Sequence, residues 1–317
     1  MRTRRLGSNG PELSVVGFGA WEAGGTAWGA NDSDDEVVEA IRTGVDAGMN
    51  WVDTAEVYGS GVSERLVGRA VAGREGVLIA SKVAPAPEGS GFRPEQVRAA
   101  CEASLGRLEV ETIDLYQLHW PDEEDTPVED TWAAMAALVE AGLVRWIGVS
   151  NFDREPIVRC EAVRHVDSLQ PRFNLLMQEE RALIRWCGDH GTGVVSYAPL
   201  GFGLLTGAIT LDTAYPEGDW RSETDDPNAP DVVPEFLPDR MPGVLTRVDR
   251  LRPIADRLGL SLAQLALAWN HHQPGVTSAI AGSRDPEHAR ANAAAGDVEL
   301  GPETLEEIDA AIAEPAI

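Results

Sequence analysis

Lysine is almost missing from this sequence of 317 residues. Lys82 is the only lysine among 26 basic residues, and all the others are arginines. Arginine serves equally well for a surface charge, whereas the compact ammonium of a lysine can tune the acidity of a neighbouring group. Chance retention of one lysine explains Lys82 when it is considered alone. Its position at the end of a predicted strand makes it a candidate for a chemical role.

Basic residues are also few beside the 52 acidic ones, and the formal net charge is −26. Such a surface repels phosphate over most of its area, which argues against a nucleic-acid partner. No stretch approaches the roughly 20 apolar residues of a membrane helix, and no apolar segment follows the basic N-terminus as it would in a secretory signal. We therefore expect neither nucleic acid nor membrane as a partner.

Cysteine is scarce as well. Cys101, Cys160 and Cys187 are odd in number and far apart, which is typical of thiols in a reducing compartment and indicates a cytoplasmic protein. His271 and His272 are adjacent and would face different sides of a helix, so they form a poor metal-binding pair. We therefore expect no bound metal. The Gly-x-Ser-x-Gly motif of α/β-hydrolases is also missing.

What the chain does contain is an alternation of short apolar segments and segments of helical periodicity. Strands are predicted at 17–21, 50–53, 77–82, 113–118, 144–150, 168–172, 193–196 and 277–281. Helices are predicted at 34–47, 63–71 with Ser63 as its cap, 94–108, 128–141, 155–163, 179–190, 244–258, 262–271, 287–294 and 302–313. An Asn9-Gly10 pair before them predicts a β-hairpin.

This alternation predicts an α/β fold, a single closed (β/α)₈ TIM barrel over residues 1–317. An open, doubly wound sheet is the alternative. Against it, residues 17–22 hold only two of the three glycines of the Gly-x-Gly-x-x-Gly dinucleotide fingerprint.

A long segment, 212–242, follows the seventh predicted strand and breaks the alternation. It has six prolines, nine acidic residues and only two arginines, Arg221 and Arg240. In a barrel it would lie on the catalytic face. An acidic surface loop and a flap over a ligand explain it equally well.

Polar residues end three neighbouring predicted strands. Asp53, Lys82 and His119 stand at the strand ends, and Tyr58 follows Asp53 by five residues. Singly, each has a structural explanation, such as a turn residue or a buried histidine. If the strand ends converge, an ammonium would lower the tyrosine pKa from about 10, and a neutral histidine would orient a substrate oxygen. This set suits protonation of a carbonyl oxygen as a hydride arrives.

Longer motifs carry a resemblance over nearly the whole chain. They are Gly17-Phe18-Gly19, Asp53-Thr54-Ala55-Glu56-Val57-Tyr58-Gly59, Ala80-Ser81-Lys82, Tyr116-Gln117-Leu118-His119-Trp120, Gly148-Val149-Ser150-Asn151-Phe152 and Gly282-Ser283-Arg284. In these the chain resembles an aldo-keto reductase. The resemblance implies Tyr58 as general acid-base, Lys82 and Asp53 as its tuners and His119 as the orienting residue.

The resemblance also implies a nicotinamide cofactor, NADP(H) in preference to NAD(H). It assigns the carboxamide to Ser150, Asn151 and Gln170, and the nicotinamide ring to Tyr197. It assigns the pyrophosphate to the loop 201–207 and the residues just before it, and the adenosine end of the cofactor to the stretch after the last predicted strand. The further cofactor residues are Pro199, Leu200, Gly203, Leu205, Gly282, Ser283, Arg284, His288 and Asn292. A lysine often stands at the position of Gly282 in this family, and an arginine or glutamine at that of His288.

Function is therefore predicted as hydride transfer between NADP(H) and a small aldehyde or ketone, in an open pocket lined by Trp21, Trp120, Phe202 and Trp220. The chain ends soon after the last predicted helix, so the long C-terminal loop that shapes the pocket for bulky substrates in some members of the family is not expected. We therefore expect small or activated carbonyl substrates, including sugar-derived ones. Two alternatives stay open: a cofactor-sensing accessory subunit with slow turnover, and a sugar or alcohol dehydrogenase working mainly in the oxidative direction. We expect a monomer or a weak homo-oligomer.

Overall fold

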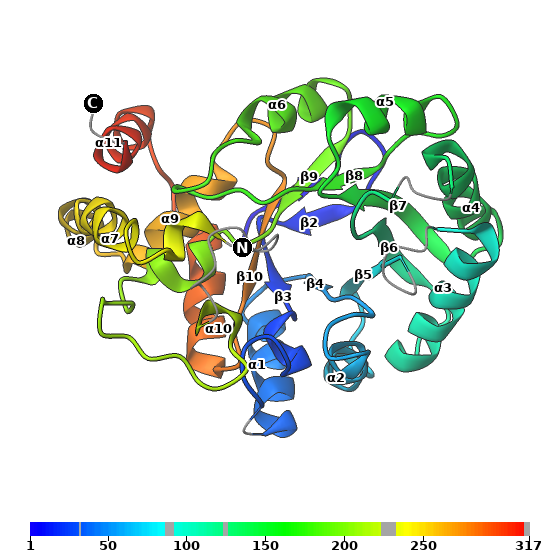
Figure 1. Cartoon of the computed structure of the whole chain (residues 1–317), viewed down its shortest axis with the longest axis horizontal. Helices are drawn as coiled ribbons and strands as arrows, with labels where there is room; N and C mark the ends of the chain where they lie inside the picture. Colours follow the sequence, from blue (N-terminus) through cyan, green and yellow to red (C-terminus); the bar gives the residue numbers. More distant parts are fainter. Residues whose placement is uncertain (32, 86–91, 123–125, 223–232, 314–317) are drawn as a thin grey trace.

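A closed barrel of eight parallel strands forms the centre of the protein, in the order β10-β3-β4-β5-β6-β7-β8-β9 (Figure 1). The computed structural model describes residues 1–31, 33–85, 92–122, 126–222 and 233–313. The strands are β3 (Val16–Gly19), β4 (Trp51–Asp53), β5 (Leu78–Val83), β6 (Ile113–Leu118), β7 (Val144–Ser150), β8 (Ser168–Gln170), β9 (Gly193–Ser196) and β10 (Ser278–Gly282). The predicted (β/α)₈ barrel is confirmed, and the open sheet is excluded.

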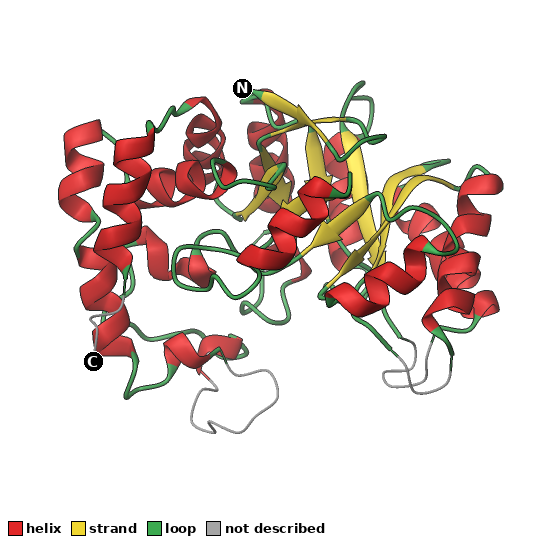
Figure 2. Cartoon of the chain, turned by 90° about the horizontal axis from the view of Figure 1, so that it is seen from above, coloured by secondary structure: helices red, strands yellow, loops and turns green. Residues whose placement is uncertain are grey.

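Helices surround the barrel, and most of them pack their apolar faces against it (Figures 1 and 2). They are α1 (Asp34–Asp46), α2 (Val62–Val71), α3 (Pro94–Leu108), α4 (Val128–Glu140), α5 (Arg154–Glu161), α6 (Arg181–Asp189), α7 (Met241–Asp249), α8 (Arg252–Leu258), α9 (Leu262–His271), α10 (Pro286–Ala294) and α11 (Pro302–Ile312). Within the described ranges, no helix combines the length and apolar character needed to span a bilayer.

Local signals set most of the helix ends. The Ser33 side chain accepts a hydrogen bond from the main-chain N–H of Glu36, so it caps α1 as a serine does before an acidic first turn. Pro94 opens α3, where its missing N–H costs nothing. Gly142 follows α4 with φ +74°, a conformation that favours glycine.

Two helix predictions were wrong. The predicted helix 244–258 is two helices, α7 and α8, because Pro253 has no N–H to continue a helix and instead lies in the first turn of α8. Ser63 does not cap α2, which begins one residue earlier after Gly61. Its hydroxyl instead donates to the Ala20 carbonyl at 2.6 Å and lies 2.7 Å from Thr54 Oγ1. Ser63 thus ties α2 to the loops after β3 and β4.

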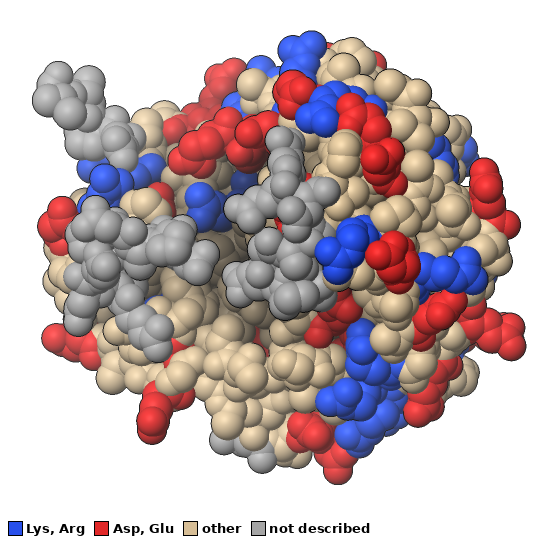
Figure 3. Space-filling model, turned by 45° about the vertical axis from the view of Figure 1, so that its right-hand side comes forward, with Lys and Arg blue, Asp and Glu red and all other residues tan. Residues whose placement is uncertain are grey.

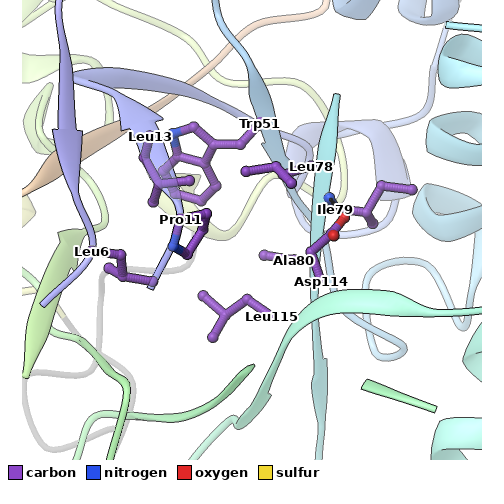
Figure 4. A pocket seen from close by; sticks show the side chains of 9 residues that line it. All are labelled: Leu6, Pro11, Leu13, Trp51, Leu78, Ile79, Ala80, Asp114 and Leu115. Atoms are coloured by element: carbon purple, nitrogen blue, oxygen red, sulfur yellow. Dashed lines mark hydrogen bonds between the residues drawn. The ribbon is translucent and has the colours of Figure 1, made fainter. Parts of the chain in front are cut away.

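The predicted hairpin, β1 (Thr3–Arg5) and β2 (Glu12–Ser14), closes the end of the barrel where the strands begin. Leu6 and Leu13 of the hairpin pack with Trp51, Leu115 and other apolar side chains of the barrel interior (Figure 4). The gap between them has a volume of about 10 Å³, at the lower limit for holding one water molecule. Ligands therefore approach from the opposite end, where the strands finish.

Polar side chains replace apolar ones toward that opposite end. Residues paired across parallel strands point to the same face, and the pairings Lys82↔Gln117, Gln117↔Gly148 and Gly148↔Ser168 place these positions in one layer. Gln170, two residues beyond Ser168, reaches across the barrel from β8 to Asp53 on β4. The layer therefore faces the interior, directly above the apolar floor.

Candidate active site

Lys82 is the centre of the polar cluster at the strand ends. Its side chain is fully buried. Its Nζ donates to Asp53 Oδ2 at 2.6 Å, to the Thr54 carbonyl at 2.9 Å and to the Tyr58 hydroxyl at 3.2 Å. These bonds use all three donors of an ammonium. Burial lowers the pKa of Lys82, and the Asp53 carboxylate opposes that effect.

Tyr58 stands on the turn between β4 and α2. Its main-chain N–H donates to the Ala55 carbonyl at 3.2 Å, and its own carbonyl accepts from Ser63 N at 3.2 Å. Burial raises the pKa of the Tyr58 hydroxyl well above the usual value of 10, and Asp53 and Tyr197 add to the rise. The expected lowering by Lys82 was wrong in direction, because desolvation of the phenolate outweighs the ammonium. The phenol is therefore protonated at neutral pH.

His119 follows β6 and faces the same cluster. Its main-chain N–H donates to the Val83 carbonyl at 2.9 Å, and its ring centroid lies 5.6 Å from that of Tyr58 in an edge-on arrangement. Burial holds the pKa of His119 well below 6.5, and Lys82 lowers it further. The imidazole is therefore neutral, as predicted, and carries a single N–H.

Asp53 is held from two sides. Lys82 takes one carboxylate oxygen, and Gln170 Nε2 donates to the other, Oδ1, at 2.9 Å. Gln170 was predicted as a carboxamide ligand. Here its amide N–H₂ also joins the Asp53–Lys82 pair from the far side of the barrel. The sequence holds no local signal for this bond, because Gln170 and Asp53 are 117 positions apart.

Ser150, Asn151 and Tyr197 form a second polar group beside the first. Asn151 Nδ2 donates to the His119 carbonyl and to Ser150 Oγ, each at 3.1 Å. The Tyr197 hydroxyl donates to Asn151 Oδ1 at 3.0 Å, and Ser150 Oγ donates to the Gln170 carbonyl at 2.9 Å. All of these predicted residues thus lie together at one edge of the mouth.

Aromatic rings surround Tyr58 and His119. The Trp21 ring lies 6.1 Å from that of Tyr58 and 6.2 Å from that of Phe202. Trp120 stacks on His119 at 3.8 Å and is 43% exposed. Trp220 lies farther out, because its ring meets Phe202, at 5.1 Å, and not Tyr58. Of the four predicted pocket residues, Trp21 and Trp120 thus stand beside Tyr58 and His119, and Phe202 and Trp220 follow behind Trp21.

A segment after β9, residues 201–222, crosses the mouth and is called the strap below. Leu200 precedes it, and the Leu200 carbonyl accepts from the N–H groups of Gly203 and Leu205. Farther along, Trp220 N donates to the Ala27 carbonyl at 3.0 Å, and Asp219 forms a β-bridge with Trp28. The strap therefore reaches the loop after β3. Residues 223–232 of the predicted flap lie outside the described residues.

Asp219 and Arg221 lock the far end of the strap. Asp219 is fully buried, and its two carboxylate oxygens accept from Arg221 Nε at 2.9 Å and Nη2 at 2.6 Å. The Arg221 guanidinium lies 4.6 Å from the ring centres of both Trp28 and Tyr215. Trp28 and Asp219 were not among the predicted site residues, since nothing in their local sequence separates them from ordinary core and loop residues.

The turn between β10 and α10 holds the remaining predicted residues. Arg284 Nη1 donates to the carbonyls of Gly29 at 3.1 Å and Ala30 at 3.0 Å, and Nη2 donates to that of Trp28 at 3.0 Å. Among the residues that the structure describes, these bonds leave its Nε–H and the second Nη2 hydrogen for another acceptor. Ser283 and Asn292 are buried, His288 is exposed, and Pro199 is buried before the strap.

Glu22 is a further residue of this region that was not predicted. It is half-buried in the 3₁₀ turn Glu22–Gly24 after β3. A Cβ added to Gly282 would lie 3.4 Å from Glu22 Oε1 and 2.8 Å from the Gly19 carbonyl, so Glu22 occupies the space that a side chain at 282 would need. Burial raises the pKa of Glu22, while Arg284, Arg221 and His288 lower it.

In the part of the chain that the structure describes, no cluster of three His, Cys, Asp or Glu side chains is arranged to hold a metal ion. The chemistry of the mouth is that of proton donors: a phenol, an ammonium and a neutral imidazole within one aromatic enclosure. These groups suit donation of a proton to an oxygen atom placed between Tyr58 and His119.

The chain is similar to known proteins over most of its length. The model of the aldo/keto reductase family matches residues 15–313. The chain is 35% identical over 295 residues to aldo-keto reductase YhdN of Bacillus subtilis (strain 168), an alignment that covers 90% of this chain and 86% of that protein.

Solved structures give the same result. The glycerol dehydrogenase AKR11B4 from Gluconobacter oxydans is similar with a TM-score of 0.84 and 32% identity, covering 98% of this chain and 94% of that one. An aldo/keto reductase from Klebsiella pneumoniae, in complex with NADP and acetate, is similar with a TM-score of 0.73 and 29% identity, covering 98% and 97%. The similarity thus includes every strand end that contributes to the mouth.

Proposed function

Because this chain belongs to the aldo/keto reductase family, we propose that it reduces small aldehydes or ketones with NADP(H), and that Tyr58 supplies the proton. The family consists of NAD(P)H-dependent oxidoreductases that act on carbonyl compounds. The observation that carries the proposal is the Lys82 ammonium, which bonds the Asp53 carboxylate and the Tyr58 hydroxyl together.

The nicotinamide end of the cofactor fits the polar group at the edge of the mouth. Ser150, Asn151 and Gln170 present hydroxyl and amide groups that match the donors and acceptors of a carboxamide, and the Tyr197 ring stands beside them, half-buried. When bound, NADPH supplies the hydride. The similar Klebsiella pneumoniae protein is in complex with NADP, which supports this choice of cofactor.

The adenosine end falls, on this proposal, to Gly282, Ser283, Arg284, His288 and Asn292. The Nε–H edge of Arg284 suits a 2′-phosphate, because a guanidinium edge binds phosphate oxygens in a bidentate manner. The strap, with Gly203 and Leu205, lies between this end and the nicotinamide end, where a pyrophosphate would run.

In this mechanism the proton moves from Tyr58 to the carbonyl oxygen. The phenol is fully protonated beforehand, since burial raises its pKa. The phenolate that remains is stabilised by the Lys82 ammonium at 3.2 Å, and Asp53 keeps that ammonium charged inside the barrel. The neutral His119 donates its N–H to the same oxygen and orients it, and Trp21 and Trp120 exclude water from the two sides.

Replacing Tyr58 by Phe tests the proposal. The change removes one hydroxyl, so aldehyde reduction should fall by a factor of about 100 or more, while NADPH binding, followed by fluorescence titration, should be retained. A variant that reduces aldehydes at the wild-type rate would assign the proton to another group. If the wild type bound no NADPH, the cofactor assignment would be wrong.

Oxidation of an alcohol is a second candidate, favoured by the similarity to a glycerol dehydrogenase. The same residues serve both directions, since Tyr58 would then take the proton from the alcohol. Rates of NADPH oxidation with a panel of aldehydes and of NADP⁺ reduction with polyols, measured at one pH, decide between them. A cytoplasmic location is part of the proposal, and the three buried, free thiols support it.

A further inference from the structure

Gln117 lies in the barrel interior with an amide that has no hydrogen-bond partner. The side chain is fully buried on β6. Both its Nε2 and its Oε1 lack a partner among the described residues. A buried amide without a partner is destabilising, so an unpaired amide in the centre of a folded barrel requires an explanation. Ordered water is the usual one.

Ser168 faces the same space. Its hydroxyl is also fully buried and unpaired within the described ranges. Gly148 lies between the two residues in the strand register, and a Cβ placed on it would be 3.2 Å from Gln117 Cγ and 3.0 Å from Ser168 Cβ. The two side chains therefore close over Gly148 from both sides, and their polar atoms share one interior region.

His119 completes the set. It follows Gln117 by two residues and points to the same side of the chain as Gln117. Its Nδ1 is buried and has no partner in the described part of the structure. Positions two apart on a strand are about 6.6 Å apart along the backbone, so the two side chains occupy adjacent places in the interior. Neither forms a direct hydrogen bond with the other among the described residues, and a water between their polar atoms is the bridge that would pair them.

We propose that Gln117 and Ser168 hold a buried water that donates a hydrogen bond to His119 Nδ1, so that the ring carries its proton on Nε2. The water's second hydrogen goes to Gln117 Oε1. The hydroxyl of Ser168, on β8, donates to the oxygen of the same water. Gln117 is thus a positioning residue for the reaction. This inference rests on the proposed function, in which the N–H of His119 must face the carbonyl oxygen.

The tautomer matters because a neutral imidazole has one N–H to offer. Which nitrogen carries it is set by the hydrogen bond that the other nitrogen makes. If Nδ1 has no donor facing it, the ring can place its proton there, and Nε2 then presents a lone pair to the carbonyl oxygen and repels it. Ligand-orienting hydrogen bonds of this kind change activity by about 10–100-fold in metal sites, where they have been measured.

The test uses ¹⁵N NMR of histidine-labelled protein, which distinguishes the two neutral tautomers without substrate or cofactor. The His119 signals are assigned by their loss in His119→Asn. Wild type should show Nε2–H, and Gln117→Met, which keeps the volume and removes the amide, should show a mixture of tautomers. The control is Thr192→Val, which removes another buried, unpaired hydroxyl before β9 and should leave the His119 signals unchanged.

Kinetics give the second readout. Gln117→Met should lower kcat for aldehyde reduction about tenfold, with the KM for NADPH unchanged. An Nδ1–H ring in wild type, or the same Nε2–H ring in Gln117→Met, overturns the inference. If Gln117→Met does not fold, a crystal structure of the wild type decides, and the inference is overturned if no water lies between Gln117 and His119 Nδ1. A wild type with the Nε2–H ring but no carbonyl turnover would refute the proposed function and leave the water site standing.

Discussion

At the scale of single residues, burial decides the behaviour of the charged groups at the mouth. Lys82 is an ammonium with no exposed surface, and it is charged because a carboxylate and two oxygen acceptors meet it. Removing one partner of a buried ion pair costs about 3–5 kcal/mol. The only lysine of the chain therefore stands where a larger, planar guanidinium would disturb three bonds at once.

Glu22 gives a prediction at the same scale. Because burial raises its pKa in the folded protein above that in the unfolded chain, the folded protein loses stability as the pH rises through the folded pKa. Glu22→Gln cannot ionise, so its Tm should exceed that of wild type above this pKa. The two should converge at a pH below the unfolded pKa of about 4.3.

Thermal unfolding of both proteins across pH 4 to 8 measures the effect. Glu287→Gln, the same substitution at an exposed carboxyl, is the matched control and should not raise the Tm at pH 8. A Glu22→Gln protein whose Tm lies below that of wild type at pH 8 would mean that the ionised carboxylate is stabilised by Arg284 and Arg221 more than burial penalises it.

At the scale of elements, the mouth is assembled from loops that hold one another. The strap reaches the loop after β3 through Asp219 and Trp220, and the β10–α10 turn reaches the same loop through Arg284. The loop 27–31 is therefore the common anchor of two segments assigned to the cofactor. Loops positioned on a rigid scaffold are where binding residues usually lie.

Arg284→Ala tests this arrangement. The change removes the bonds to the loop 27–31, so both NADPH and NADH should bind more weakly. NADPH should lose about tenfold more, because a charge-assisted hydrogen bond to its 2′-phosphate contributes about 1.5–3 kcal/mol. Fluorescence titration with the two nucleotides gives the ratio. Equal losses would show that Arg284 only braces the loop and that the 2′-phosphate binds elsewhere.

At the scale of the whole molecule, the acidic surface sets the response to salt. The net charge is −26, and on the face in Figure 3 acidic side chains are spread over the surface beside smaller groups of basic side chains. Exposed ion pairs contribute only about 0–1 kcal/mol each. Salt weakens both the attraction within these pairs and the repulsion among the excess acidic side chains. With twice as many acidic as basic residues, the repulsion is larger than the attraction.

Added NaCl should therefore stabilise the protein. Between low salt and about 0.5 M the Debye length falls from tens of Å to under 10 Å, and the Tm should rise by about 2 °C or more. Sucrose at equal osmolality is the control for solvent effects other than screening. A Tm that is constant or falls with NaCl would show that the surface ion pairs outweigh the net repulsion.

Most of the architecture was predictable because its signals are local. The strands and helices follow from apolar periodicity. Ser33 marks a helix end through its side-chain hydroxyl, and Pro94 and Gly142 do so through their backbone conformation. The parallel (β/α) alternation then leaves few topologies. Once the strand ends are adjacent, Asp53, Lys82 and His119 must meet, so that convergence was implied by the order of residues alone.

Tertiary structure alone decided the quantities that depend on partners far along the chain. Gln170 joins Asp53 across the barrel, Glu22 fills the space beside Gly282, and Ser63 bonds a loop instead of capping its helix. The direction of the Tyr58 pKa belongs here too, since a sequence names the charges near a phenol and does not give the extent of its desolvation. Burial is set by the packing of all the strands and loops together, and only the folded barrel specifies it.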